Sequence, residues 1–499
     1  AGMIGIPGTE QRLFGALADA AVSVVMISQG SSEHSICFAV KDEFAERARE
    51  VVEKTFEEDI ADNKMQRVSV TPGLSILAVV GDTMHGKPGV AAKVFSSLGN
   101  AGVNVKVIAQ GSSERNISAV IDQGDAMRAV RAVHSSFYLS PQTLSIGVIG
   151  CGTVGKTLLA QLSSEIGRLS SQFNLDLRVR GLARSSKMLL KEQRIDLDSW
   201  SESFDQDGVP LDIDAFVDHV NAEHMPHVVI VDCTADEGVA SRYGDWLEAG
   251  IHVVTPNKKA SSASFKDYKR LQEQRLKGKT RFLYETTVGA ALPIIQTVRD
   301  LRETGDRITR VQGILSGTLA YLFNQYDGTK PFSEIVSEAR ASGYTEPDPR
   351  DDLSGMDVAR KCIILAREIG LELELSDVDV ENLVPVALRD ASADEFLERL
   401  SEMDADIEQK FRQAQKDNKV LRYVAELDLK GRATVALMAL PVDHAFAHIN
   451  LTDNIVQFET ERYCDNPLIV QGPGAGPDVT AAGVFADLLR LSAYLGAAV

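Results

Sequence analysis

The sequence lacks three features that would place it in a specialised class of protein. It contains no run of about 18 or more apolar residues, and its mean hydropathy is −0.07, so we expect no membrane span. Its five cysteines are scattered, odd in number and never spaced as CxxC, which indicates reduced thiols in an intracellular protein and gives no zinc signature. The first residues have neither the charged nor the apolar region of a secretory signal peptide.

Basic residues are also few. The chain has 52 lysines and arginines against 71 aspartates and glutamates, a net charge of −19, and no basic stripe that would neutralise phosphates. We therefore expect no nucleic-acid partner. Hydrophobic residues at 44% and charged residues at 25% are ordinary for a globular protein, and 499 residues, at roughly 100–200 per domain, predict about three or four domains.

The N-terminal part contains a duplicated module. Residues 22–36 align with residues 103–117, and both segments contain Gln-Gly-Ser-Ser-Glu. Each copy is expected to form a glycine-rich loop, a helix and an alternating strand that ends in this segment, followed by a second strand and a second helix. A strand at 75–80 precedes the loop of the second copy, and its counterpart in the first copy would lie before residue 1. We therefore expect the chain to begin inside a module.

The βαββαβ order and the paired copies resemble ACT domains of the aspartokinase type, which are small amino-acid-sensing modules. The two modules are expected at 1–62 and 63–141. Gln29 and Gln110 are equivalent by the repeat, and their amides can both donate and accept hydrogen bonds near a helix N-terminus that suits a carboxylate. We interpret them as effector-binding residues. The alternative is that each glutamine only completes a turn.

A dinucleotide fingerprint follows a short linker at 138–143. An apolar strand at 144–149 runs into a glycine-rich turn and an apolar-periodic helix, and the predicted cofactor contacts of the turn are Gly150, Gly152, Thr153, Val154 and Gly155. The glycines let the backbone approach a pyrophosphate at the helix N-terminus. The alternative is a structural turn without a ligand.

The end of the next strand predicts NADP rather than NAD. Strand 176–183 ends at Ala183, where an NAD enzyme would place an acidic residue for the ribose hydroxyl, whereas Arg184 and Lys187 can pair with a 2′-phosphate. An exposed basic loop is the alternative. Thr234 and Lys258 follow two further strands at their carboxyl ends, where open α/β sheets bind ligands, although a loop lysine can also be merely solvated.

Three segments in the remainder point to chemistry. Residues 282–293 combine Glu285 with a small-residue loop whose carbonyls suit a hard cation. Residues 343–361 carry several acids and place Lys361 four residues after Asp357, which predicts either an acidic pocket for a substrate ammonium with a proton-donating lysine, or a capped helix with an exposed ion pair. Residues 472–491 form a second glycine-rich loop and helix, which indicates a return to the nucleotide-binding domain, or else a plain turn.

Six motifs in order resemble homoserine dehydrogenase over residues 144–499: GxGxVG, VDCT, VTPNKKA, ETTVGAALP, GILSGT and GYTEPDPRDDLSGMDVARK. With the two ACT modules, the chain resembles the C-terminal part of the bifunctional aspartokinase–homoserine dehydrogenases. No residues of a kinase domain are present, so aspartokinase activity is expected to be absent. The implied fold is α/β, with a Rossmann-type nucleotide-binding domain at 142–293 and 470–499 and an α+β catalytic and dimerisation domain at 294–469.

The resemblance implies reversible hydride transfer between NADP(H) and aspartate 4-semialdehyde or homoserine. Lys361 matches the proton-donor lysine, and Lys258 matches a second active-site lysine that also lies close to the cofactor. The substrate-binding acids would be Glu346, Asp351, Asp352 and Asp357, and two further cofactor contacts would be Gly343 and Gly476. The family's sodium site would be formed by the side chain of Glu285 and the carbonyls of Val288, Ala290 and Leu292.

The resemblance also implies partners. We expect threonine as the effector, a homo-oligomer such as a dimer or tetramer, and a bacterial cytoplasmic protein rather than a plastid one.

Two rival functions remain. Aspartate-semialdehyde dehydrogenase would need a nucleophilic cysteine with a histidine partner, and no cysteine here has an evident one. A catalytically silent effector-sensing module is the other, and the intact Lys258, Lys361 and GxGxxG argue against it.

Overall fold

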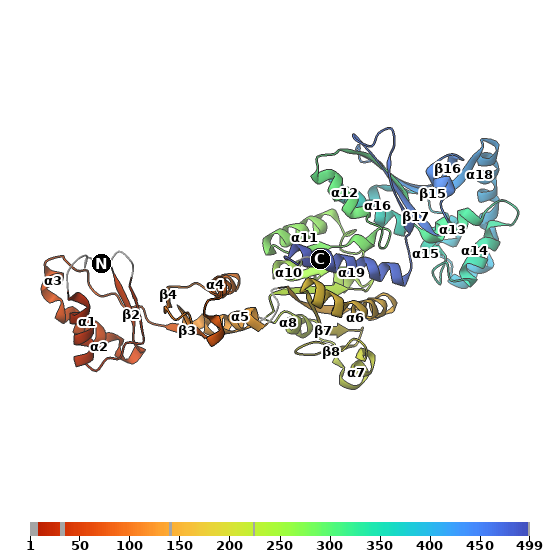
Figure 1. Cartoon of the computed structure of the whole chain (residues 1–499). Coiled ribbons are helices and arrows are strands. Elements are labelled where there is room, and N and C mark those ends of the chain that lie inside the picture. Colours follow the sequence, from red (N-terminus) through yellow and green to blue (C-terminus); the bar gives the residue numbers. More distant parts are fainter. Residues whose placement is uncertain (1–7, 30–34, 139–141, 223–224, 498–499) are drawn as a thin grey trace. The chain divides into compact units, whose positions relative to one another are not determined.

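The computed structural model describes residues 8–29, 35–138, 142–222 and 225–497, and it divides into two units, Ala1–Pro141 and Gln142–Val499 (Figure 1). The start of the first glycine-rich loop, with Met3, Gly5 and Pro7, lies outside the described residues, as does the middle of the predicted linker. In the described part of the chain, no helix is long and apolar enough to cross a membrane.

The first module of the N-terminal unit pairs two short strands with amphipathic helices. Its elements are α1 (Thr9–Asp19), β1 (Met26–Gln29), β2 (Ile36–Ala39), α2 (Ala45–Thr55) and α3 (Glu57–Ala61), and β1 pairs with β2 in antiparallel fashion. Leu13 and Leu17 of α1 and Val52 of α2 fill the core of the module with Phe56. They recur at helical spacing, so each helix turns one apolar face inward.

The second module has one strand more. It consists of β3 (Leu74–Val80), α4 (Val90–Asn100), β4 (Val107–Gln110), β5 (Asn116–Asp122) and α5 (Ala126–Tyr138), and its antiparallel sheet has the order β3-β5-β4. Val94 and Leu98 of α4 pack with Val133 of α5 on one face of the sheet.

The last strand of the predicted βαββαβ order is not present among the described residues of either module. Residues 62–73 alternate like a strand in part, but they form none. The amide of Val68 donates instead to the carboxylate of Glu53, at 3.3 Å, and Pro72 interrupts any further pairing. After α5 the chain leaves the described residues at 139.

The nucleotide-binding half is a seven-stranded sheet of order β12-β11-β10-β6-β7-β8-β9. Its strands are β6 (Thr143–Ile149), β7 (Asp176–Ala183), β8 (Lys187–Leu190), β9 (Val209–Pro210), β10 (His227–Asp232), β11 (His252–Val254) and β12 (Phe282–Leu283), and the first five in the sheet order are parallel. The strand order reverses beside β6, so the carboxyl ends of β6 and β10 form the switch point where such sheets bind ligands.

Helices cover both faces of this sheet. They are α6 (Thr153–Phe173), α7 (Trp200–Asp207), α8 (Ile213–Val220), α9 (Glu237–Ala240), α10 (Tyr243–Glu248), α11 (Phe265–Gly278) and α19 (Pro477–Tyr494). Although α19 comes from the far end of the sequence, it lies beside α6 (Figure 1), and Leu488 and Leu491 share a core with Leu158 and Leu162.

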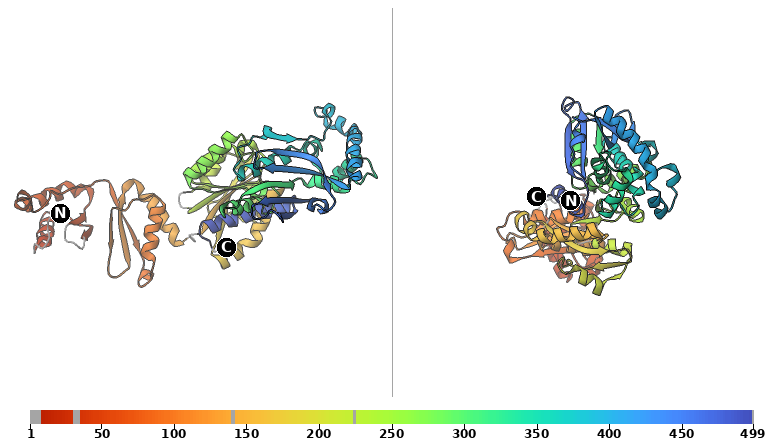
Figure 2. Two further views of the ribbon diagram at one scale, coloured as in Figure 1. Left: turned by 90° about the horizontal axis from the view of Figure 1, so that it is seen from above. Right: turned by 90° about the vertical axis from the view of Figure 1, so that its right-hand side faces the viewer.

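The remaining half is α+β, with a six-stranded sheet of order β14-β16-β15-β13-β17-β18. Its strands are β13 (Ile308–Ile314), β14 (Val378–Val380), β15 (Lys419–Asp428), β16 (Ala433–Pro441), β17 (Asp453–Thr460) and β18 (Leu468–Pro473), and its helices are α12 (Ile294–Glu303), α13 (Gly317–Gln325), α14 (Phe332–Ala341), α15 (Arg350–Leu353), α16 (Met356–Glu368), α17 (Ala393–Glu398) and α18 (Asp404–Lys416). The right-hand view of Figure 2 shows strands on one side and helices on the other.

The start of α16 is fixed by a glycine. Gly355 has a φ of 73°, a left-handed conformation, and a Cβ at this position would lie 2.0 Å from the hydroxyl oxygen of Tyr423 on β15. Only glycine allows the helix to begin so close to the sheet. Asp357 and Lys361 are on this helix, so the approach places both of them over the sheet.

The core shared by α6 and α19 gives a stability prediction. We expect Leu488→Ala to lower the free energy of unfolding by about 2–5 kcal/mol, because the fully buried side chain leaves a cavity in a packed interface. Urea denaturation followed by circular dichroism measures this. Leu276→Ala is the matched control, since that leucine is 66% exposed and should change the free energy of unfolding by less than about 0.5 kcal/mol. Equal effects of both variants would contradict the role of α19 in the core.

Candidate active site

The glycine-rich turn after β6 is closely fitted to its surroundings. Gly150 has a φ of 92°, and a Cβ there would lie 2.7 Å from Cγ2 of Thr234; a Cβ on Gly155 would lie 2.1 Å from the carbonyl oxygen of Gly150. By contrast, a Cβ on Gly152 would meet no described atom within 4 Å. Thr153 and Val154 open α6, whose N-terminus has no side-chain cap among the described residues. Its free N–H groups therefore fit a pyrophosphate.

A buried carboxylate organises the two loops beyond this turn. Asp232 ends β10 and is fully buried. Its carboxylate accepts hydrogen bonds from the amide of Thr234 at 2.8 Å, from Nδ2 of Asn257 at 3.0 Å and from the hydroxyl of Tyr243. Because Thr234 and Asn257 belong to the loops after β10 and β11, Asp232 fixes the loop that carries Lys258 against the glycine-rich turn.

Lys258, Asp357 and Lys361 meet in one cluster. Nζ of Lys258 lies 3.2 Å from Oδ1 of Asp357, and Nζ of Lys361 lies 3.0 Å from Oδ2 of the same carboxylate. Lys361 also donates to the carbonyl oxygen of Leu315 at 2.7 Å. One carboxylate on α16 thus links a lysine of the nucleotide-binding half to a lysine of the other half.

The three charges change one another's acidity. Burial alone would raise the pKa of Asp357, but the ammonium groups of Lys361 and Lys258 outweigh it and hold that pKa well below its usual range. Burial lowers the pKa of Lys361, and the charge of Lys258 adds to this, while Asp357 opposes both. Lys361 is therefore a stronger acid than an ordinary lysine.

The other predicted substrate acids are placed less uniformly. The amide of Glu346 donates to Oδ2 of Asp352 at 2.8 Å, whereas the side chain of Glu346 is exposed. Burial, and to a lesser degree the charges of Glu346 and Asp357, raise the pKa of Asp352. Asp352 therefore belongs to the same electrostatic cluster. Asp351 is exposed and contacts neither lysine in the part of the chain that the structure describes.

Of the two predicted 2′-phosphate readers, Arg184 directly follows β7 and Lys187 is the first residue of β8. The Ala183 carbonyl accepts from the amide of Gly150 at 2.9 Å, and the amide of Arg184 donates to the carbonyl of Lys187 at 2.9 Å. The guanidinium of Arg184 lies 4.6 Å from the ring centroid of Phe204, and Lys187 is exposed. Arg184 is therefore held by an aromatic ring at the edge of the fingerprint turn.

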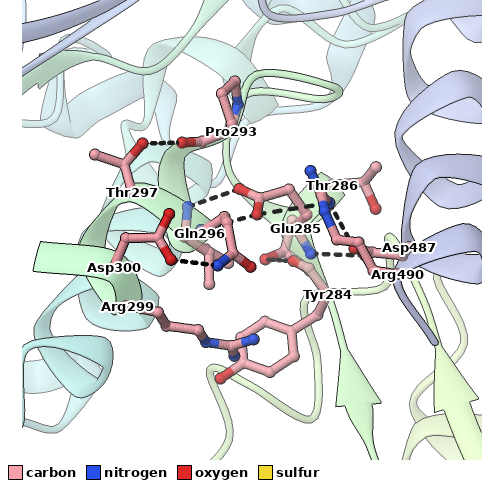
Figure 3. Close-up of polar contacts among 12 residues, drawn as sticks. Tyr284, Glu285, Thr286, Pro293, Gln296, Thr297, Arg299, Asp300, Asp487 and Arg490 are labelled. Carbon is pink, nitrogen blue, oxygen red and sulfur yellow. Dashed lines mark hydrogen bonds and ion pairs between the residues drawn. The ribbon is translucent and has the colours of Figure 1, made fainter. Parts of the chain in front are cut away.

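Glu285 is buried between the two halves of the C-terminal unit. Figure 3 shows it between the start of α12 and Asp487 and Arg490 of α19. Its carboxylate accepts from the amide of Ile295 at 2.6 Å and from the amide of Gln296 at 2.9 Å, and so caps α12. Burial, together with the charge of Asp487, raises the pKa of Glu285 to about 7.

The carbonyls predicted to join Glu285 at a cation lie in the same loop. Val288 and Ala290 are buried, and among the described residues their carbonyl oxygens accept no hydrogen bond, whereas that of Leu292 accepts from the amide of Ile294 at 2.8 Å. The described residues contain no group of three histidine, cysteine or acidic side chains that could hold a metal. A cation here would therefore depend on backbone oxygens, and two unpaired buried carbonyls beside a buried carboxylate fit it.

The two glycines and the two glutamines are placed as follows. Gly343 ends α14 with a φ of 75°, which a helix terminus explains by itself, and Gly476 begins α19 with a φ of 114°. In the N-terminal unit, Gln29 and Gln110 are exposed at the ends of β1 and β4, and Nε2 of Gln29 donates to the Glu10 carboxylate at 3.3 Å. The positions that follow Gln29 lie outside the described residues.

The sequence did not predict three groups of this site, namely the carbonyl of Leu315, the side chain of Asn454 and the carboxylate of Asp232. The Leu315 carbonyl follows β13 in the GILSGT motif, but a backbone acceptor has no sequence signal of its own. It also accepts from Nδ2 of the buried Asn454 at 3.3 Å. Asp232 lies in the VDCT motif, where a carboxylate at the end of an apolar strand was the available signal.

Comparisons with known proteins show which families the parts of the chain match. Residues 150–285 match the family model "Homoserine dehydrogenase, NAD binding domain", residues 293–489 match "Homoserine dehydrogenase", and residues 1–56 and 77–137 match "ACT domain". The bifunctional aspartokinase/homoserine dehydrogenase 1, chloroplastic, of Zea mays is 50% identical over 99% of this chain and 54% of its own length. The bifunctional aspartokinase/homoserine dehydrogenase of Haemophilus influenzae is 41% identical over 98% of this chain and 60% of its own length.

A solved structure is also similar. The crystal structure of a Candida auris protein of unknown function is 36% identical, with a TM-score of 0.64 over 71% of this chain and 98% of its own. The chain spans about half the length of the curated relatives it matches. The two dehydrogenase models together cover the unit that holds the lysine–carboxylate cluster and the glycine-rich turn. The chain therefore belongs to the homoserine dehydrogenases, a family of NAD(P)-dependent oxidoreductases, and carries ACT modules.

Proposed function

We propose that the chain interconverts aspartate 4-semialdehyde and homoserine with NADP(H). The observation that carries this proposal is the carboxylate of Asp357 held between Lys258, from the nucleotide-binding half, and Lys361, at 3.2 and 3.0 Å. Such a cluster can transfer a proton to a carbonyl oxygen while it is reduced. Membership of the homoserine dehydrogenase family supports the identity of the substrate pair.

Lys361 is the proton donor in this proposal. Its ammonium group has three N–H bonds, of which one points to Asp357 and one to the Leu315 carbonyl. The third is left for the aldehyde oxygen. During reduction the carbon gains a hydride and the oxygen gains this proton, so Lys361 is left as a neutral amine that recovers a proton from solvent. NADPH, when bound, would supply the hydride.

The remaining side chains bind and orient. The N-terminus of α6, with Gly150 and Gly152, would hold the pyrophosphate, and Thr234 and Lys258 would border the nicotinamide. Glu346 and Asp352 would attract the substrate ammonium. Because the pKa of Asp357 is held low by its two lysines, that carboxylate stays ionised and keeps both ammonium groups in place.

The cysteines do not favour the rival semialdehyde dehydrogenase. That reaction needs a thiolate nucleophile. Burial raises the pKa of Cys151 to about 11 and of Cys362 to about 12, and it raises the pKa of Cys233 further still. Cys151 lies in the glycine-rich turn and Cys233 lies beside it, so thiols that stay protonated there oppose covalent catalysis.

We propose NADPH as the preferred cofactor, because Arg184 is held on Phe204 beside the fingerprint turn where a 2′-phosphate would lie.

We further propose a monovalent cation, such as sodium, at Glu285, Val288, Ala290 and Leu292. Two buried carboxylates, Glu285 and Asp487, face one half-buried guanidinium, Arg490, 3.9 and 2.8 Å away. A cation would balance this charge and brace the loop before α12.

Threonine is the effector that we propose for the ACT modules, with Gln29 and Gln110 as binding residues. Equivalent positions at the ends of β1 and β4 support this, because both amides are exposed at the end of a strand.

Self-association through the modules is supported by apolar side chains that stay exposed on their strands, namely Ile27, Ile76, Val80 and Ile108. Of the two compartments, the plastid gains support from the chloroplastic maize relative, since the bacterial relative is less similar.

The proton-donor role predicts the behaviour of Lys361→Met. NADPH binding should stay within about twofold, while NADPH oxidation with aspartate 4-semialdehyde should fall by roughly 10²–10⁴-fold. Lys277→Met, which removes a largely exposed lysine of α11, is the control. In the wild type, reduction should slow as pH rises through the lowered pKa of Lys361, because only the ammonium form donates. Turnover at the wild-type level would remove Lys361 from this role.

The cofactor proposal predicts that Arg184→Ala weakens NADPH binding by roughly ten- to a hundredfold, the value of a hydrogen bond to a charged group. NADH binding should change by less than about threefold. Cofactor fluorescence titrations measure both constants. Arg178→Ala, at the amino end of the same strand, is the control, because Arg178 pairs with Asp176 at 2.7 Å, far from the turn. Equal losses for NADH and NADPH would show that Arg184 acts through packing alone.

The effector proposal predicts that Gln29→Ala and Gln110→Ala each weaken threonine binding by about tenfold, through loss of a hydrogen bond to the bound ligand. Isothermal titration calorimetry with threonine measures this, and Gln123→Ala, an exposed glutamine of the second module, is the control. An effect of only one variant would leave one effector site. Threonine binding that is indifferent to both changes would refute the glutamine assignment.

A further inference from the structure

We propose that Arg367 is a positioning residue that holds the loop of Lys258 at a fixed distance from α16. The kinetic part of this inference rests on the proposed function, whereas its structural part does not. Arg367 is six residues after Lys361 on α16, and its side chain is 1% exposed. It is therefore a buried charge that comes from the same helix as the proton donor.

The contacts of Arg367 are directed at the loop that follows Lys258. Nη1 donates to the Ser261 carbonyl at 2.7 Å, and Nη2 donates to the Ala263 carbonyl at 2.7 Å and to the Leu373 carbonyl at 3.2 Å. The planar guanidinium presents its donors as a fork, so a single side chain can hold two carbonyls of one loop. A lysine has no such geometry.

The loop transmits this hold to Lys258. The carbonyl oxygen of Lys258 accepts from the amide of Ser262 at 2.9 Å and from the hydroxyl of Ser262 at 2.8 Å. Ser262 lies between the two residues that Arg367 binds. Fixing Ser261 and Ala263 therefore fixes the turn that begins at Lys258.

Lys258 is thus joined to α16 at two points about 15 Å apart along the helix, given 1.5 Å per residue between Asp357 and Arg367. At the first point, the ion pair with Asp357, the side chain of Lys258 is 31% exposed and that of Asp357 is 42% exposed. A substrate ammonium would compete for that carboxylate. The second point is buried and does not change with the substrate, so it keeps Lys258 in place when the first is disturbed.

The surroundings of Arg367 support the same loop. Oε2 of Glu374 lies 3.6 Å from Nη2 of Arg367, and its Oε1 accepts from the amide of Phe265 at 2.8 Å, at the start of α11. The guanidinium also lies 5.0 Å from the ring centroid of Tyr268 on that helix. The charge is therefore enclosed by the loop and by the helix that continues it.

The test compares Arg367→Lys with Arg422→Lys in the full chain. Arg422 is the matched control because it too is buried and donates to backbone carbonyls, which among the described residues are those of Phe323, Leu421, Phe446 and Ala447, away from the Lys258 loop. We expect Arg367→Lys to lower kcat by roughly ten- to a hundredfold, the cost of a misplaced group, with the NADPH dissociation constant within about twofold. Arg422→Lys should leave kcat within about twofold.

Hydrogen exchange provides a readout that does not need activity. In Arg367→Lys the amide of Ser262 should exchange at least about tenfold faster than in the wild type, because the turn opens locally. In Arg422→Lys it should be unchanged. If Arg367→Lys does not fold, Glu374→Gln is the substitute variant, since it keeps an acceptor for Phe265 and removes the charge beside Arg367, and it should shift both measurements in the same direction by a smaller factor.

The outcomes separate the two hypotheses. A wild-type chain that does not oxidise NADPH refutes the proposed function. The exchange measurement then still tests whether Arg367 fixes the loop that follows Lys258. An active wild type with equal losses of kcat in Arg367→Lys and Arg422→Lys refutes the positioning role. Unchanged exchange at Ser262 in the Arg367 variant, or in its Glu374 substitute, refutes it as well.

Discussion

The candidate active site depends on one carboxylate that two ammonium groups share. Asp357 would be costly to bury as an isolated ion, and so would Lys361. Together with Lys258 they form a triad with one excess positive charge, close to a region rich in acids. The triad joins the two halves of the C-terminal unit, because Lys258 follows a strand of one sheet and the other two residues are on a helix that packs against the other sheet. The proposed chemistry and the joining of the halves thus use the same atoms.

Several buried polar groups serve the loops around this triad. Asp232 ties together the loops after β10 and β11, Arg367 ties the second of these loops to α16, and Glu285 caps α12 from the nucleotide-binding half. Each is a charged side chain that binds backbone groups. The loops after parallel strands have few apolar contacts of their own, so directional bonds to the backbone set their conformation where hydrophobic packing would not.

Repeats and hydrophobic spacing in the sequence predicted the helices and strands whose formation depends on neighbouring residues. The repeat and the amphipathic spacing gave the helices of both ACT modules, and an apolar strand before Gly150 gave the start of the Rossmann-type half. The pairings between distant segments have no local signal: 25 residues separate Asp232 from Asn257, and 106 separate Ser261 from Arg367. Pairing also decides the last strand of the first module, since residues 62–73 resemble a strand locally but form no strand in the described part of the chain.

The return of α19 to α6 has a consequence for synthesis. The nucleotide-binding sheet is translated before the catalytic sheet, but Val484, Leu488 and Leu491 complete its core from a helix that emerges after about 180 residues of other structure. During translation, the apolar residues of this domain that α19 covers therefore stay exposed to solvent while the second half folds. Of the two halves of the C-terminal unit, the half that is made first is the last to close, so chaperone binding during translation should concentrate on α6 until α19 has left the exit tunnel.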